Sequence, residues 1–266
     1  MKEFFGVGGY ARVPEGYMSW QHLTFVSALM VIMTLCAVLL GKKYRYADEK
    51  QKSKALIWAA LLIDGIEILK IVVMCLRSDD VVSTLLMELP LFLCSIQLIT
   101  IPLAAFSKGR IRQAALDFVF IFGVLGAVLG TYAAGQNYAC YPVLSIDNVA
   151  SGITHSISGF SALYIGFSGL ISMNRKNCGI TFGILGFFCC TAYIVNIIVD
   201  YNYMFLMAGD GTPYDLLYNL VGGSPVLYPI GVVALLLIYI IVFYVAHYFI
   251  SKKKHAKITE KTEVVL

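Results

Sequence analysis

A thiol, an amide and an imidazole lie within strongly apolar stretches of this sequence. Cys94 and Gln97 belong to MELPLFLCSIQLITIPL (residues 87–103), and His155 belongs to GITHSISGF (residues 152–160). A thiol becomes a nucleophile when a base such as histidine stabilises its thiolate. An amide one turn further along the chain can hold the oxygen on which negative charge develops. The residue types therefore indicate acyl-transfer chemistry, with Cys94 as nucleophile and His155 as base, if the fold brings them together.

Further polar side chains interrupt the apolar stretches. Ionisable residues at membrane depth are costly and are candidate functional residues by default. We predict that a polar substrate-binding set accompanies the catalytic pair: Gln97, Glu88, Asn196, Asn202 and Glu67. Each also has a purely structural interpretation, because residues three apart on a helix, such as Glu67 and Lys70, can form an ion pair. A buried cysteine, likewise, most often packs as a small hydrophobic side chain.

Proline and glycine mark local features of the predicted helices. Pro90 has no N–H for the preceding turn, so the helix through Cys94 is expected to bend just before the thiol. Gly126 and Gly130 have the GxxxG spacing, with Gly123 one turn earlier, which is typical of close helix packing. Residues 214–221 are predicted to form a short interfacial helix that ends at a glycine pair.

The elements that must position these residues are membrane helices. The chain has 266 residues, of which 59% are hydrophobic and 14% charged. Continuous apolar runs of about 20 residues recur along it, which predicts an all-α, polytopic membrane helical bundle. A membrane β-barrel is excluded, because its strands would alternate apolar and polar residues. We expect one transmembrane domain over residues 1–250 and a polar tail over residues 251–266. About seven transmembrane helices are predicted: Trp20 to Leu40, Ala55 to Leu76, Val82 to Phe106, Ala114 to Ala133, Val149 to Met173, Ile180 to Val199, and Val226 to Ile250.

The basic residues between these helices indicate an orientation. Sixteen lysines and arginines fall in the first, third and fifth connections and in the tail, which would lie on one side of the membrane. The N-terminal segment and the remaining connections, on the opposite side, hold only Lys2, Arg12 and Arg77. Since cytoplasmic loops carry the excess of basic residues, the N-terminus is predicted outside and the C-terminus in the cytoplasm. Basic residues at helix ends do not indicate nucleic-acid binding. The seven cysteines show neither metal-ligand spacing nor a disulfide framework, so no metal and no cofactor is expected.

Three segments carry a resemblance to a known family. The segments ELPLFLCS, GITHSISGF and NYMFL…LLYNLVGGSPVLY resemble the YwaF family of bacterial integral membrane proteins. That family is similar to transmembrane protein 164, a lipid acyltransferase in which a membrane cysteine and histidine are implicated. The resemblance implies a bacterial plasma-membrane protein that acts on a phospholipid or lysophospholipid, with Cys94 and His155 at the catalytic positions. One position departs from the pattern, because Phe92 stands where a histidine is expected.

The residues alone leave three classes of function open. The first is a thiol-dependent lipid acyltransferase or hydrolase. The second is a transporter or binding protein whose polar pocket takes a small solute, although the sequence has no inverted repeat. The third is an accessory membrane protein in which these groups only join helices. Approach of the Cys94 sulfur to a ring nitrogen of His155 near hydrogen-bond reach, with looser geometry allowed in the unliganded protein, would favour the enzyme. A cavity open sideways to lipid would also favour the enzyme, whereas one open only to water would favour transport. The sequence indicates no oligomeric state.

Overall fold

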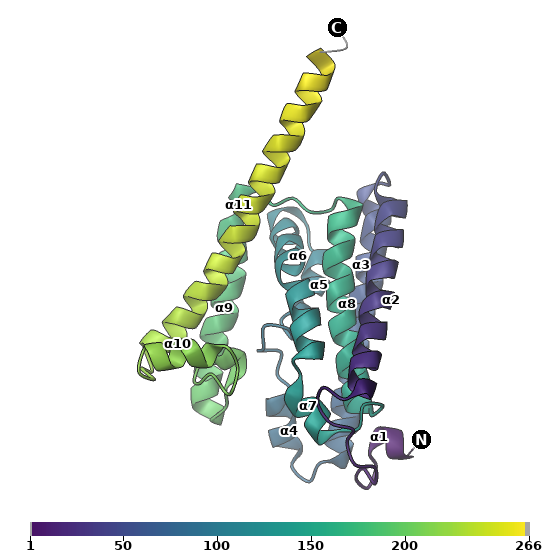
Figure 1. The fold of residues 1–266 in the computed structure, drawn as a ribbon, viewed down its shortest axis with the longest axis vertical. Helices are drawn as coiled ribbons and strands as arrows, with labels where there is room; N and C mark the ends of the chain where they lie inside the picture. Colours follow the sequence, from purple (N-terminus) through teal and green to yellow (C-terminus); the bar gives the residue numbers. More distant parts are fainter. Residues whose placement is uncertain (1, 264–266) are drawn as a thin grey trace. The chain divides into compact units, whose positions relative to one another are not determined.

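A computed structural model describes residues 2–263, with side chains described as far as Lys252 (Figure 1). All regular secondary structure in this part of the chain is helical, which confirms the predicted all-α class. The chain divides into two compact units, Met1–Ser172 and Met173–Leu266. Each unit is described by itself.

The first unit is built around one central helix. Its elements are α1 (Lys2–Phe5), α2 (Trp20–Tyr44), α3 (Glu49–Arg77), α4 (Val81–Met87), α5 (Gln97–Phe106), α6 (Gly109–Tyr132), α7 (Gly135–Cys140) and α8 (Ile146–Ser168). Helix α8 packs against α2, α3 and α6. It is rich in serine and glycine, and small residues allow helices to approach closely in a membrane. A Cβ added at Gly152, for example, would lie 2.9 Å from Leu29 Cδ1 of α2.

The ends of the first unit are fixed by polar contacts. At one end, Arg112 of α6 pairs with Glu49 of α3 at 3.2 Å, and the Tyr164 hydroxyl of α8 donates to the Lys52 carbonyl at 2.9 Å. At the other end, Arg77 of α3 pairs with Asp147 of α8. The chain therefore runs along this unit in alternating directions through α2, α3, the α4–α5 pair, α6 and α8. The first and third basic connections lie at the same end, as the sequence predicts for this unit.

The prediction of one continuous third helix, from Val82 to Phe106, is wrong. The structure breaks it into α4 and α5, which are joined by residues 88–96. Pro90 explains the break, because it has no N–H and disfavours helical geometry in the residue before it. Tight turns replace the helix, with the Leu91 N–H donating to the Leu89 carbonyl and the Ile96 N–H to the Phe92 carbonyl. Cys94 consequently lies in a turn before α5 and not on a helix.

The second unit is a helical pair with a folded connection. It contains α9 (Arg175–Val199), a 3-10 turn η1 (Tyr203–Phe205), α10 (Tyr214–Leu220) and α11 (Leu227–Glu263). Helix α10 confirms the short helix predicted at residues 214–221. The hydroxyls of Thr181 and Tyr244 lie 3.0 Å apart and join α9 to α11. The predicted polar tail, residues 251–266, lies largely outside the residues whose side chains are described.

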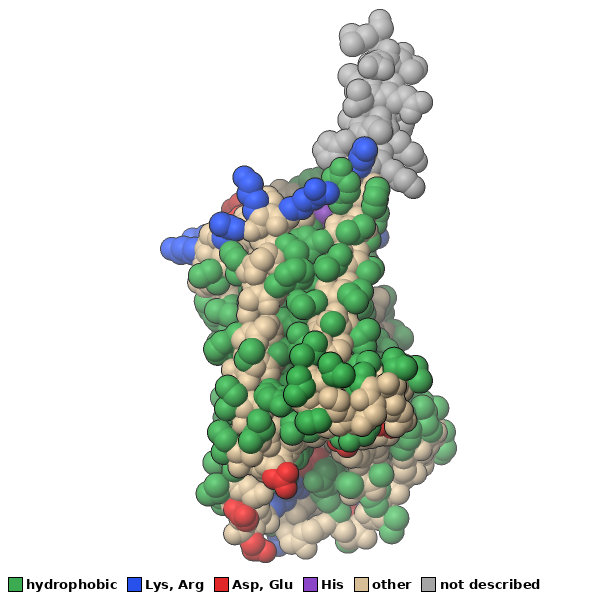
Figure 2. Space-filling model, turned by 90° about the vertical axis from the view of Figure 1, so that its left-hand side faces the viewer, with side chains coloured by type: hydrophobic (Ala, Val, Ile, Leu, Met, Phe, Trp, Pro, Cys, Tyr) green, Lys and Arg blue, Asp and Glu red, His purple; other side chains and the backbone are tan. Residues whose placement is uncertain are grey.

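Hydrophobic side chains remain exposed along the helix flanks, as expected for surfaces that face lipid (Figure 2). Four segments are long and apolar enough to cross a membrane: Trp20–Tyr44, Gly109–Cys140, Arg175–Val199 and Leu227–Lys252. Helix α3 is long enough but carries Asp64, Glu67 and Lys70 along its middle, and the α4–α5 pair is broken. The structure thus supports a multi-pass membrane protein with four strongly apolar crossings.

Candidate functional site

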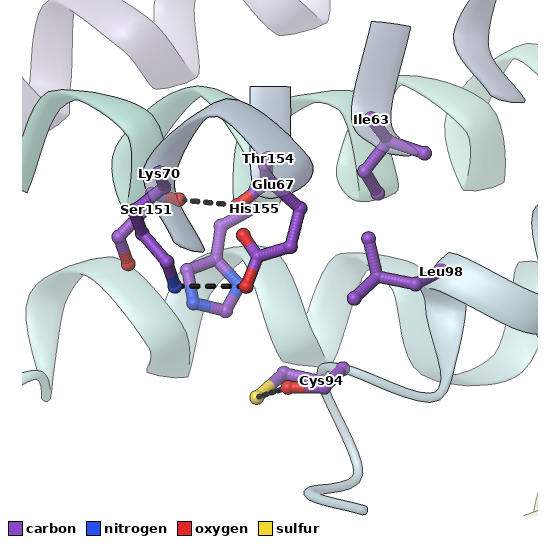
Figure 3. Close-up of a pocket in the computed structure, with 9 residues that line it drawn as sticks. Ile63, Glu67, Lys70, Cys94, Leu98, Ser151, Thr154 and His155 are labelled. Atoms are coloured by element: carbon purple, nitrogen blue, oxygen red, sulfur yellow. Dashed lines mark hydrogen bonds and ion pairs between the residues drawn. The ribbon is translucent and has the colours of Figure 1, made fainter. Parts of the chain in front are cut away.

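The first unit contains a small pocket formed by α3, α8, α5 and the turn before α5 (Figure 3). Its volume is about 50 Å³, which is room for a few water molecules or one small polar group. The residues that line it are Ile63, Glu67, Lys70, Cys94, Ser95, Leu98, Ser151, Thr154 and His155. Three of the predicted site residues, Cys94, His155 and Glu67, are therefore brought together.

Cys94 lies in the turn with one backbone hydrogen bond and one neighbouring hydroxyl group. Its carbonyl accepts from the Gln97 N–H at 3.3 Å, and its Sγ lies 4.0 Å from the Ser95 hydroxyl. The turn leads directly into α5, whose N-cap is Ile96. The positive end of the α5 dipole therefore lies beside Cys94 and favours negative charge there.

Helix α6 passes directly behind both candidate catalytic residues. A Cβ added at Gly126 would lie 3.6 Å from the Cα and Cβ of Cys94, and one added at Gly130 would overlap the His155 ring. The two glycines are one turn apart, so the positions they face are separated by roughly 6 Å along α6. Within the described residues no hydrogen bond joins Cys94 to His155. The pair shares one pocket and one supporting helix without direct contact.

An ionic cluster joins the pocket to the Cys94 segment. Lys70 Nζ lies 2.8 Å from Glu67 Oε1 and 2.9 Å from Glu88 Oε2, and all three side chains are largely buried. The predicted pairing of Glu67 with Lys70 is confirmed. Glu88 is the C-cap of α4, where the break begins. The cluster places two acidic side chains around one ammonium group and ties the broken segment to α3.

Gln97 does not line the pocket. It is the first residue of α5, so Cys94 and Gln97 do not share a helical face as the sequence indicated. The buried side chain accepts a hydrogen bond from the Thr100 hydroxyl at 3.1 Å, whereas its amide nitrogen has no partner among the described residues. Its role as a donor to substrate stays a prediction.

Asn196 and Asn202 lie in the second unit and organise its connection. Asn196 donates to the Tyr203 carbonyl at 3.0 Å and accepts from the Tyr203 N–H at 2.7 Å. Asn202 donates to the Ala208 carbonyl at 2.8 Å and to the Asp210 carboxylate at 2.6 Å. Both amides thus hold the loop that follows α9. Their contribution to substrate binding stays a prediction.

Three hydroxyl residues of the pocket were missed by the sequence analysis. Ser151 and Thr154 precede His155 on α8, and Ser95 follows Cys94. The spacing of Ser151 and His155, four residues apart on one helix, was a usable signal, because such residues share a helix face. The Thr154 hydroxyl donates to the Ser151 carbonyl at 3.0 Å.

The N-terminal segment is fastened to the ends of α3 and α8. Arg77 contacts the Asp147 carboxylate at 2.5 and 3.0 Å and donates to the Tyr10 hydroxyl at 2.8 Å. The Tyr10 hydroxyl donates to Asp147 at 2.5 Å. Burial, reinforced by the hydrogen bond to Asp147, raises the pKa of Tyr10 to about 12. Tyr10 is therefore a neutral hydrogen-bond donor at physiological pH.

Comparison with known families gives one match over most of the chain. The sequence profile of the TMEM164 family matches residues 17–250, a range that includes Cys94 and His155. Comparisons with curated proteins and with solved structures found no match. The family match agrees with the similarity to transmembrane protein 164 that the sequence segments indicated.

Proposed function

We propose that this chain, which belongs to the TMEM164 family, is a multi-pass membrane enzyme that transfers or hydrolyses the acyl group of a phospholipid or lysophospholipid. The observation that supports this proposal is that Cys94 and His155 line one pocket. A thiol and an imidazole in one membrane-embedded pocket have the residue types of a nucleophile and its general base.

The proposed reaction has two steps. The Cys94 sulfur attacks the ester carbonyl carbon while His155 takes the thiol proton. The carbon–oxygen bond then breaks, a thioester remains on Cys94, and His155 gives the proton to the leaving alcohol. In the second step the hydroxyl of a lysophospholipid, or water, attacks the thioester, with His155 again accepting the proton. The thiolate that leaves takes this proton and the enzyme is restored.

The size of the pocket limits which part of the substrate it holds. A volume of about 50 Å³ takes the ester group but not an acyl chain. The acyl chains of the substrate would therefore lie along the apolar helix flanks. There they take the place of the acyl chains of other membrane lipids, at little cost in free energy. Glu67 and Lys70, which line the pocket, would meet the polar end of the lipid.

The finer topology is part of the proposal. Seven crossings are obtained when α3, α8 and the α4–α5 pair are added to the four strongly apolar crossings. The basic connections then support a topology with the N-terminus outside and the C-terminus in the cytoplasm. The three quoted segments further support membership of the YwaF branch and a bacterial plasma membrane.

Acyl transfer by purified protein tests the function. Liposomes of a defined phospholipid with a labelled acyl chain, mixed with an unlabelled lysophospholipid, would be followed by mass spectrometry. We expect labelled acyl transfer or labelled fatty acid release by the wild type and none by Cys94→Ala. Cys36→Ala changes an exposed cysteine of α2 and serves as a matched control. Turnover by a stably folded Cys94→Ala protein would reject the mechanism.

A further inference from the structure

Three glycines of α6 face different neighbours, although their spacing alone suggests one packing stripe. A Cβ at Gly123 would crowd the α8 backbone, at 2.7 Å from the Ser158 carbonyl oxygen. At Gly126 it would make an ordinary contact of 3.6 Å with Cys94. At Gly130 it would overlap the imidazole ring of His155, and all three nearest atoms belong to that ring. Gly130 therefore leaves space for a side chain and not for a helix backbone.

We propose that Gly130 is a positioning residue that fixes the orientation of the His155 ring in the pocket it shares with Cys94. This inference rests on the proposed function, in which His155 is the base. His155 extends from α8 onto the surface of α6, and the missing Cβ at Gly130 lets the ring lie directly against that helix. Any side chain at residue 130 forces the ring to another rotamer or displaces it.

The consequence for catalysis follows from the reach of proton transfer. A general base acts over a heavy-atom distance of about 2.6–3.2 Å, or through one water molecule. A displacement of about 1 Å in such a constellation lowers the rate by roughly 100-fold. Gly126 lies one turn away and faces the Cys94 turn. A methyl group added there would fit, at 3.6 Å from the Cα and Cβ of Cys94. Of the two glycines, only Gly130 lies where an added Cβ would displace a pocket side chain.

The first experiment compares three alanine variants of the full-length protein. For Gly130→Ala we expect kcat to fall at least tenfold with little change in KM, because substrate binding does not require the base. The rate of Cys94 alkylation at neutral pH, followed by mass spectrometry of its peptide, should fall to that of His155→Ala. Gly126→Ala should stay within a few-fold of the wild type. Wild-type alkylation and turnover in Gly130→Ala would overturn the proposal.

Gly123→Ala is the matched control for helix separation. It crowds α8 without touching the His155 ring, so it measures what a wider α6–α8 spacing does by itself. Its alkylation rate should depend on pH as the wild-type rate does, whereas that of Gly130→Ala should lose the step that His155 produces. An equal change of the pH profile in both variants would show that Gly130 acts only through helix packing, and would overturn the proposal.

A coupling experiment decides the matter even if Gly130→Ala folds poorly. The His155→Ala substitution removes the ring that a Cβ at residue 130 would overlap. Gly130→Ala should therefore lower the Tm of the otherwise wild-type protein, and lower the Tm of the His155→Ala protein much less. An equal loss of Tm, or of folded yield, in both backgrounds would contradict the contact. This measurement needs no lipid turnover. A wild type that shows the coupling but transfers no acyl group would reject the proposed function and keep the contact.

Discussion

Lys70 of α3 binds Glu88, the residue at which the helix α4 ends, at a distance of 2.9 Å. The same ammonium binds Glu67 at 2.8 Å. Largely buried charges persist only when they are paired, so this contact fixes where the Cys94 turn begins relative to α3. The ionic cluster is thus part of the framework that holds the candidate nucleophile in place.

Lys70→Met should therefore destabilise the protein strongly. It leaves two mostly buried carboxylates without their cation, and removing one partner of a buried pair typically costs about 3 kcal/mol or more. Thermal unfolding in a fixed detergent would show a clear loss of Tm. Proteolysis within residues 88–96 should become faster, because the turn is no longer tied to α3.

Arg112→Met provides the control for Lys70→Met. Its partner Glu49 is exposed at the end of the bundle, and exposed ion pairs contribute about 0–1 kcal/mol. The Arg112 variant should unfold close to the wild-type temperature. Comparable losses in the two variants would show that burial of the Lys70 cluster has no special effect on stability.

Pro90→Ala tests the break that precedes Cys94. Restoring the N–H at residue 90 allows α4 to continue, which would carry the Cys94 turn away from its seat on α6. We expect turnover and Cys94 alkylation to fall roughly tenfold or more while the protein stays folded. Pro102→Ala lies inside α5 beyond the pocket and should change neither rate appreciably. Unchanged rates in Pro90→Ala would mean that the break does not depend on the proline.

Much of the fold follows from sequence patterns that act locally. Apolar runs of spanning length predicted the helices, and the spacing of Glu67 and Lys70 predicted their ion pair. Pro90 correctly predicted that the helix is disturbed before Cys94, but not that the helical structure is lost over residues 88–96. One proline gives a bend or a full break according to whether other contacts satisfy the freed backbone groups. Here the local turns up to Ile96 provide such contacts, and the Lys70–Glu88 ion pair, which depends on tertiary packing, ties the segment to α3.

The pocket itself could be predicted only in part. Cys94 and His155 were selected by residue type, but their proximity depends on α6, which passes behind both. Gly126 and Gly130 were assigned to helix packing. The GxxxG spacing does not show whether a glycine faces the backbone of another helix or the ring of a histidine side chain. Gln97 was assigned to the face of Cys94 by helical periodicity. That periodicity does not hold, because the helix begins at Gln97 itself.

The contact of Tyr10 with Asp147 predicts a stability change at high pH. The pKa of Tyr10 rises from 10.0 to about 12 on folding, so the folded state binds the proton more tightly. The stabilisation is fully present below pH 10 and is lost as the pH rises through 12. The stability difference between the wild type and Tyr10→Phe should be constant from pH 7 to 9 and should shrink between pH 10 and 12, as measured by chemical unfolding. A constant difference across the whole range would contradict the contact.

The basic connections predict the orientation in the membrane. Fusions of a fluorescent protein that matures only in the cytoplasm should be bright after residue 50 and dark after residue 211. Alkaline phosphatase fusions at the same positions should give the opposite pattern, because that enzyme is active only outside. Both readings are needed, since loss of one signal can also reflect poor expression. A bright fluorescent fusion after residue 211 would reverse the proposed orientation.

Cys94 and His155 should act as one unit. If His155 takes the proton of the Cys94 thiol, loss of either residue removes the same step, and the second loss costs nothing more. Cys94→Ala and His155→Ala should each lower acyl transfer by at least 100-fold, and the double variant should be no slower than the slower single variant. Cys94→Ser should retain little activity, because a hydroxyl is a poorer nucleophile at its ordinary pKa. Ser95→Ala removes a neighbouring hydroxyl of the same pocket and should keep most of the activity. Multiplying losses in the double variant would show that the two residues contribute independently, as packed core residues would, and not as nucleophile and base.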